Sequence, residues 1–156
     1  MTRYSPLAVL VISLGLVACG GDDDSSAPTR AEFAKSANKI CNQTQKELDK
    51  VGGSAESPAE IANALDATID KSKQAADDLV ALDRPEGADG EKAKQFVEGF
   101  RTELNDKVVP VLEDLKTALK NKDSQGVQEA AAKLQDIETS PSDKPARELG
   151  ATACVG

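Results

Sequence analysis

Three cysteines and a set of carboxylates are the side chains of this 156-residue chain that could do chemistry. The cysteines are Cys19, Cys41 and Cys154, and the chain contains no histidine. Without histidine, neither a Ser-His-Asp triad nor a Cys-His pair can form, and the commonest transition-metal ligand is missing. Cys19 stands between an apolar run and three aspartates, so the first question is whether it is trimmed away, bonded to another cysteine or used for attachment.

The residues before Cys19 predict an export signal. Arg3 is followed by an uncharged run from Leu7 to Ala18, which is shorter than the roughly 20 residues of a membrane span and has the layout of a secretory signal. An ordinary signal peptidase site has small residues at −3 and −1, whereas a cut before Cys19 would place Leu16 at −3. The segment Leu-Val-Ala-Cys instead resembles the lipobox of bacterial lipoproteins, in which the cysteine is acylated on sulfur and becomes the new N-terminus. This resemblance implies cleavage of residues 1–18 and lipidation of Cys19.

Residues 19–28 form a predicted lipidated tether. The stretch from Gly20 to Pro28 has no apolar periodicity, and its composition is typical of a solvated linker. Nine extended residues reach at most about 30 Å. Asp22, Asp23 and Asp24 do not predict a calcium site, because neighbours in a flexible segment cannot bring six or more oxygens onto one ion. We therefore expect residues 29–156 to form a domain close to the extracytoplasmic face of the membrane, with the lipid on Cys19 as the contact.

Acylation of Cys19 leaves Cys41 and Cys154 as an even pair in an exported chain. Such a pair is expected to form a disulfide in an oxidising compartment. The loop it closes exceeds one hundred residues, for which the chain-entropy model gives about 4.7 kcal/mol. A redox role would need a close C-x-x-C pair or a thiol of lowered pKa, and the sequence suggests neither. The predicted role of the disulfide is structural.

The carboxylates are the only remaining candidates for catalysis. Asp77 with Asp78, and Glu113 with Asp114, are neighbours on predicted helices and so point in different directions, which favours solvated faces over acid-base pairs. A carboxylate-based hydrolase is therefore the least favoured alternative. No cofactor or metal is expected either: the chain has no glycine-rich phosphate loop, its one methionine is Met1, and bundle diiron sites require Glu-x-x-His.

The elements that must position these residues are all predicted to be helices. A capping box from Thr29 to Glu32 starts the first, whose apolar face includes Cys41, and Gly52 and Gly53 end it. A second capping box, from Ser57 to Glu60, starts a helix that Pro85 ends. Residues 84–90 form the predicted turn that follows.

The third predicted helix is the longest, from about Asp89 to Asn121. Pro110 lies within it, lacks an amide hydrogen and crowds a preceding carbonyl, so a kink is expected there. The fourth runs from about Asp123 to Ile137, and a short last turn is possible over residues 146–149. Gly99 and Gly126 within these helices are expected to mark close helix contacts. Short connections favour antiparallel neighbours, so the predicted fold is an all-α, up-and-down antiparallel four-helix bundle with one disulfide.

Composition excludes one class of partner. The chain carries 27 acidic and 19 basic residues, a net charge of −8, and no basic stripe that could displace counterions from a nucleic acid. Aromatic residues are few, with Phe33, Phe96, Phe100 and Tyr4 and no tryptophan. The core must therefore be built mainly from aliphatic side chains and alanine, which suits closely packed helices.

Three short motifs together resemble a family of small secreted or lipid-anchored helical proteins of actinobacteria and their relatives. The family pattern F-x-x-x-A-x-x-I-C corresponds to Phe33, Ala37, Ile40 and Cys41. The L-x-x-P-x-G turn corresponds to Leu82, Pro85 and Gly87, and the closing L-G-x-x-x-C to Leu149, Gly150 and Cys154. The resemblance covers nearly all of the mature chain and implies the paired cysteines, but the family is uncharacterised and implies no activity.

These observations predict a lipid-anchored cell-envelope protein that is not an enzyme. Its helical domain is expected to act as a binding or scaffolding module, with an envelope protein as partner and no nucleic acid. The alternative is a carrier whose bundle opens near Pro110 to hold a small apolar ligand.

Overall fold

A computed structural model describes residues 26–53, 57–137 and 140–155 of the chain. All regular structure within these ranges is helical, as predicted, and no strand occurs there. The predicted signal segment, residues 1–18, lies outside the described residues, as do Cys19 and most of the predicted tether.

The first two helices begin where their capping boxes predict. Helix α1 spans Arg30–Gly52, and the Thr29 hydroxyl and the Glu32 carboxylate each pair with the backbone of the other residue. Helix α2 spans Pro58–Val80, and Ser57 and Glu60 form the same reciprocal pair. Both boxes satisfy amide donors that would otherwise lack partners in the first turn.

The third predicted helix is divided in the structure. Helix α3 spans Gly87–Glu103, a π-helical turn η1 spans Leu104–Val108, and α4 spans Val109–Asn121. The wide turn ends just before Pro110, whose nitrogen has no hydrogen to continue the i to i−4 pattern. The run also begins two residues before the expected Asp89, because Gly87 adopts a φ of 63° that lets the chain turn sharply from Pro85 into the helix.

The C-terminal part contains more helix than expected. Helix α5 spans Ser124–Gln135 and is capped by the Asp123 carboxylate, which accepts from the amides of Gln125 and Gly126. The possible last turn at residues 146–149 belongs to a longer helix, α6, Asp143–Leu149. A final 3-10 turn, η2, spans Thr152–Cys154.

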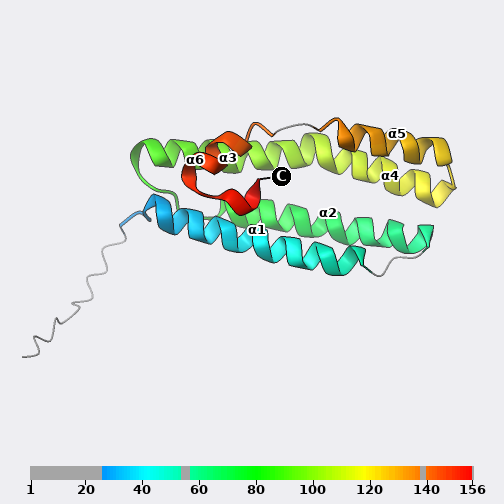
Figure 1. Cartoon of the computed structure of the whole chain (residues 1–156), viewed down its shortest axis with the longest axis horizontal. Coiled ribbons are helices and arrows are strands. Elements are labelled where there is room, and N and C mark those ends of the chain that lie inside the picture. The colour runs from blue at the N-terminus through cyan, green and yellow to red at the C-terminus, as the bar shows by residue number, and fades with distance from the viewer. Residues whose placement is uncertain (1–25, 54–56, 138–139, 156) are drawn as a thin grey trace, which may run out of the picture.

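The helices lie in two layers along the long axis of the molecule. Figure 1 shows α1 and α2 together in one layer, and the α3–α4 run with α5 in the other. Helix α2 packs against both α1 and α4, and α4 packs against α5. Helix α6 lies on α3, and η2 lies on α1. The C-terminal segment therefore bridges the two layers over one half of the molecule.

The core is concentrated in the half that this segment bridges. Phe33 of α1 and Phe96 of α3 are fully buried and meet edge to face, with ring centroids 6.5 Å apart. Phe96 meets Phe100 in the same way at 6.3 Å. The remaining buried side chains of this core are aliphatic: Ala37, Leu79, Ala93, Val97, Ala146, Leu149 and Ala151.

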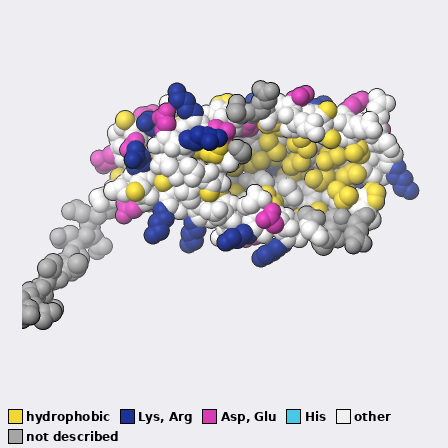
Figure 2. All heavy atoms as spheres, viewed as in Figure 1, with side chains coloured by type: hydrophobic (Ala, Val, Ile, Leu, Met, Phe, Trp, Pro, Cys, Tyr) yellow, Lys and Arg dark blue, Asp and Glu magenta, His cyan; other side chains and the backbone are white. Residues whose placement is uncertain are grey.

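The other half of the molecule is less tightly closed. There several apolar side chains of α2, α4 and α5 are only half-buried: Leu65, Leu115, Leu119 and Val127. Figure 2 shows apolar side chains gathered on this half of the visible face, between the two layers. The fold therefore combines a packed end with an end whose apolar interior reaches the surface.

Candidate functional site: an apolar pocket beside the disulfide

Cys41 of α1 and Cys154 of η2 form a disulfide, as the cysteine count predicts. Their Cα atoms lie 5.2 Å apart although the residues are separated by 113 positions in sequence. Two hydrogen bonds from Asn38 support the same junction: its Nδ2 donates to the Gly150 carbonyl at 2.9 Å, and its Oδ1 accepts from the Ala153 amide at 2.8 Å. The chain end is thus fixed to the first helix at three points.

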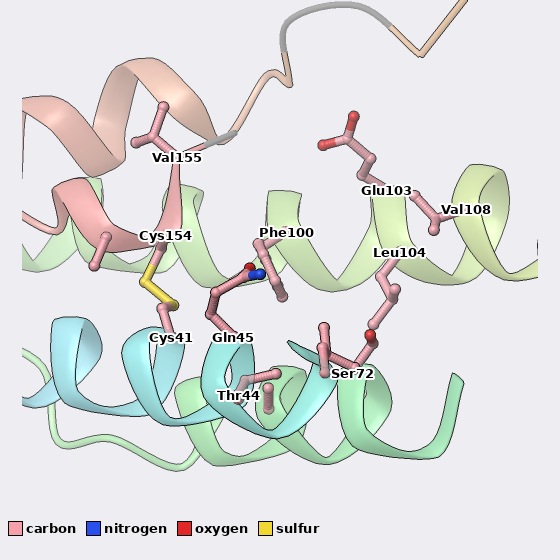
Figure 3. Close-up of a pocket in the computed structure, with 13 residues that line it drawn as sticks. Cys41, Thr44, Gln45, Ser72, Phe100, Glu103, Leu104, Val108, Cys154 and Val155 are labelled. Carbon is pink, nitrogen blue, oxygen red and sulfur yellow. A yellow bond between two sulfur atoms is a disulfide. The ribbon is translucent and has the colours of Figure 1, made fainter. Parts of the chain in front are cut away.

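A pocket of about 290 Å³ opens beside this disulfide. It lies between α1, α2, the end of α3 with η1, and η2, so all these elements contribute to its wall. Figure 3 shows the disulfide and Val155 on one side, with Leu104 and Ser72 pointing toward each other on the other. Besides the disulfide, seven apolar side chains of the described residues line it: Leu48, Ala75, Phe100, Leu104, Val108, Ala153 and Val155.

Two polar side chains in the pocket wall are already occupied by local hydrogen bonds. The Thr44 hydroxyl donates to the Ile40 carbonyl at 3.0 Å. The Gln45 amide nitrogen donates to the Asp49 carboxylate at 2.9 Å. Because both donors have partners on α1, the inner surface of the pocket is predominantly apolar, which is the character of small-molecule sites in proteins.

Among the residues that the structure describes, Glu103 is the one carboxylate in the wall of this pocket. It is the last residue of α3, and Figure 3 shows its carboxylate pointing away from the disulfide, Leu104 and Ser72. Its Oε2 accepts a hydrogen bond from the Ser140 hydroxyl, which lies 37 positions further along the chain. Ser140 Oγ is also 2.6 Å from Ser142 Oγ. The geometry allows either hydroxyl to donate in that second bond.

The environment of Glu103 favours its protonated form. Burial raises the pKa of this carboxyl, and the nearby Asp143 raises it further, while Lys107 acts in the opposite direction. Burial is the largest of these effects, because a carboxylate loses hydration when it is covered by protein. The other oxygen, Oε1, accepts no hydrogen bond from any residue in the described ranges.

A second, more polar groove adjoins the pocket and shares Glu103 with it. This groove has a volume of about 610 Å³ and lies between α3 and the start of α6. Its charged lining consists of Glu98, Glu103, Asp106, Lys107 and Lys144. Glu103 therefore stands at the boundary between an apolar cavity and a charged surface groove.

The carboxylate pairs considered from sequence lie elsewhere. Asp77 and Asp78 are both exposed on α2. Asp114 pairs with Lys133 at 3.0 Å, and Glu113 pairs with Lys116. These acids are thus solvated or matched by lysines.

Lys116 also joins two helices. Its ammonium group lies 2.7 Å from the Asp66 carboxylate, which links α4 to α2. The hydrogen bond to Lys116 lowers the pKa of Asp66, and the bonds to Asp66 and Glu113 raise the pKa of Lys116. This arrangement links α4 to α2, and its carboxylates pair with a lysine instead of forming an acid-base pair.

The glycines expected at close contacts behave as predicted, whereas Pro110 does not belong to this pocket. A Cβ on Gly99 would lie 3.4 Å from the side chain of Ser142, and one on Gly126 would lie 3.0 Å from that of Ala118. Pro110 lines a separate surface groove with Asp106 and Asp136. The opening next to the disulfide is formed by η1, one turn earlier in the chain.

Sequence reasoning missed Glu103, Ser140 and Ser142. Glu103 is one of many acids on a helix, and its burial depends on a segment 37 residues away. The only local signal was the broken helical pattern at Ser140 and Ser142, which indicated a loop but not where it would pack.

No group of three or more potential metal ligands comes together among the described residues. Within the same ranges, no helix is both long enough and apolar enough to cross a bilayer. Comparisons with protein-family models, with curated proteins and with solved structures found no match to this chain.

Proposed function

We propose that the mature protein is a lipid-anchored, non-enzymatic binding module of the cell envelope, and that its helical domain holds a small apolar ligand. The observation that carries the ligand part is the apolar pocket of about 290 Å³ beside the Cys41–Cys154 disulfide. This geometry favours the carrier over a scaffold that acts only through its outer surface.

The size of the pocket suits a short alkyl chain or a compact apolar ring. Ligand pockets begin at roughly 300 Å³. At about 30 Å³ for each water-sized group, the cavity has room for roughly eight to ten carbon atoms. Access from the surface agrees with reversible binding, because the pocket is open to solvent beside the disulfide.

Anchoring rests on the sequence. The segment that ends at Cys19 resembles a lipobox, and residues 20–28 would separate the lipid from the helical domain. One acyl chain gives marginal membrane binding, and two or three give stable attachment. We propose that the domain faces the extracytoplasmic side, where an oxidising environment would maintain the disulfide.

Two finer points of fold and relationship belong to the same proposal. We propose that α1, α2, the α3–α4 run and α5 form an up-and-down antiparallel bundle, which the packing of α2 on α1 and α4 supports. We also propose that the α3–α4 run bends near Pro110, which the π turn before it supports. We also propose membership of the actinobacterial family that the cysteine motifs resemble, which the positive φ of Gly87 at the family's turn glycine supports.

The ligand proposal is tested by titrating 1-octanol into the oxidised full-length chain carrying Cys19→Ser, which cannot be acylated. Amide chemical shifts should change saturably near Cys41–Leu48, η1 and η2. Ser72→Phe, which fills the pocket, should abolish these changes, while Ser36→Phe, the same substitution at an exposed site of α1, should leave them intact. Absent or scattered shifts in the parent chain would overturn the proposal.

Anchoring is tested separately in cells. Radiolabelled fatty acid should enter the protein, and Cys19→Ala should abolish the label and release the protein from stable lipid attachment. The same cells offer a further test of the ligand proposal, because mass spectrometry of gently extracted native protein should reveal a co-purifying small molecule. If Cys19→Ala incorporates as much fatty acid as the parent, Cys19 is not the attachment site.

A further inference from the structure

The apolar residues that line the pocket are followed, along the same helices, by the half-buried apolar residues of the less closed half. We propose that the ligand is a lipid with a single chain of about twelve or more carbons, whose end enters the pocket beside the disulfide and whose remainder lies along α2, α4 and α5. This inference rests on the proposed function of the pocket and adds the class of ligand and a second part of its site.

Along the α3–α4 run, the apolar face of the pocket continues beyond it. Leu104 and Val108 line the pocket. Leu115 and Leu119 follow Val108 by seven and eleven residues, a spacing that places residues on the same face of a helix. Both leucines are only half-buried. The apolar face that starts in the pocket therefore extends for about three further turns of helix.

Helix α2 carries a matching face. Ser72 lines the pocket, and the half-buried Leu65 precedes it by seven residues, or about two turns. Asp66, the next residue, pairs with Lys116 of α4 at 2.7 Å. Leu65 of α2 and Leu115 of α4 therefore lie at the same level, beyond the pocket.

Helix α5 covers only one side of this extension. Gly126 lies close to α4, since a Cβ at this position would be 3.0 Å from the side chain of Ala118, and the neighbouring Val127 is half-buried. Within the described ranges, α5 packs on α4 but has no comparable packing on α1. Figure 2 shows apolar side chains together at the surface of this half, with the visible Lys, Arg, Asp and Glu side chains toward its edges. An apolar face therefore stays open between the two layers.

The dimensions of the site favour a flexible chain over a protein partner. The pocket holds about 290 Å³, less than the roughly 400 Å³ of a single turn of an α-helix about 10 Å in diameter. A partner helix on the open face could not also fill the pocket, whereas an alkyl chain can occupy both. A second copy of the chain is disfavoured for the same reason and by repulsion, because each copy carries a net charge of −8.

The lipid enters with the apolar end of its chain. Among the described residues, Glu103 is the one charged residue in the pocket wall, and Figure 3 shows its carboxylate pointing away from the disulfide, Leu104 and Ser72. A polar head inside the pocket would lose its hydration without gaining a charged partner. The head therefore remains outside the pocket, in solvent.

The experiment compares lysophosphatidylcholines with acyl chains of eight, ten, twelve and fourteen carbons, each below its micelle-forming concentration, on the oxidised full-length chain carrying Cys19→Ser. A fully buried methylene strengthens binding about fourfold, and we expect about twofold on a half-buried face. Calorimetric titration should therefore show binding strengthen by about tenfold or more from ten to fourteen carbons. The fourteen-carbon probe should also shift the amide resonances of Leu65, Leu115 and Leu119, which the eight-carbon probe should leave unchanged.

A variant on the open face separates the two parts of the site. Leu115→Gln makes this face polar, so it should weaken the fourteen-carbon probe roughly tenfold and leave the eight-carbon probe unchanged. Thr117→Gln is the matched control, because Thr117 is exposed on the same helix, and it should change neither.

Two results would overturn this inference while leaving the proposed function in place. One is equal affinity for the ten-carbon and fourteen-carbon probes in a chain that still binds 1-octanol, and the other is unchanged fourteen-carbon binding in Leu115→Gln. A dimer of the ligand-free chain in sedimentation analysis, dissociated by Leu115→Gln, would assign the open face to a second copy and contradict the lipid. Failure of 1-octanol and of all four lipids to bind would instead overturn the apolar pocket as a ligand site.

Discussion

At the residue scale, a few large side chains carry much of the packing. Phe96 is fully buried and contacts both other phenylalanines of the described chain edge to face. Around it the core is built of alanine, leucine and valine side chains. A smaller side chain at Phe96 would therefore lose the packing against both other rings.

Phe96→Ala should lower the free energy of unfolding by about 3–5 kcal/mol, because it removes a buried ring and leaves a cavity. Chemical denaturation followed by far-UV circular dichroism measures the change. Ile61→Ala is the control, because Ile61 is 37% exposed, and it should cost about 1 kcal/mol or less. Equal losses in the two variants would contradict a core centred on Phe96.

We expect Glu103 to make the stability of the fold depend on pH with a sign opposite to that of the capping-box glutamates. Its folded pKa is raised, so the native state binds the proton more tightly, and the stability contributed by this carboxyl decreases as pH rises from its unfolded value of about 4.3. At pH 7, Glu103→Gln should therefore be more stable than the parent. Near pH 4 the difference should disappear.

The matched variant for this pH experiment is Glu32→Gln. Hydrogen bonds from Thr29 lower the pKa of Glu32, so its stabilising effect is present above its unfolded pKa and is lost as pH falls through the folded one. Glu32→Gln should therefore be less stable than the parent at pH 7. Thermal unfolding at pH 7 and pH 4 distinguishes the two signs, and a loss of stability in Glu103→Gln at pH 7 would contradict the raised pKa.

At the scale of elements, helix ends are determined locally and helix interiors by packing. The capping boxes at Thr29 and Ser57 placed the starts of α1 and α2 correctly because their hydrogen bonds join residues three apart. The division of the third helix was less predictable. Pro110 indicated a disturbance, but the π turn precedes it at Leu104–Val108, where Leu104 is buried and contributes to the pocket wall.

Gly87→Ala should cost about 1–2 kcal/mol, since Gly87 has a φ of 63° and a side chain there carries the left-handed penalty. The loss should come from the backbone alone, because a Cβ at this position would meet nothing within 4 Å. Gly87→Asn should cost less, because asparagine tolerates this conformation. Denaturant titration compares them, and equal stability of Gly87→Ala and the parent would contradict the assigned turn.

At the scale of the whole molecule, the C-terminal segment decides which half of the fold is closed. Helix α6 packs on α3 and η2 packs on α1, so this segment bridges the two layers beside the aromatic core. It also supplies Cys154 and Val155 to the pocket wall. The disulfide therefore stabilises the fold and completes the candidate site.

The double variant Cys41→Ser/Cys154→Ser should lose about 2–5 kcal/mol of stability, because the remaining attachment of η2 depends on the hydrogen bonds of Asn38. It should also bind 1-octanol more weakly, since one side of the pocket is no longer fixed. Urea denaturation and octanol titration measure the two effects. Cys19→Ser alone should change neither, and unchanged stability of the double variant would contradict the structural role of the disulfide.

The sequence by itself determined the all-helical class, the helix starts at Thr29 and Ser57 and the pairing of Cys41 with Cys154. Caps and periodicity act over three or four residues, and counting leaves one pairing when Cys19 is assigned to lipid. Only the tertiary structure decided that α6 and η2 would close one half of the molecule. It likewise brought Ser140 to Glu103 and formed the pocket beside the disulfide, because burial of a given acid depends on which distant segment packs over it, and local patterns carry no record of that contact.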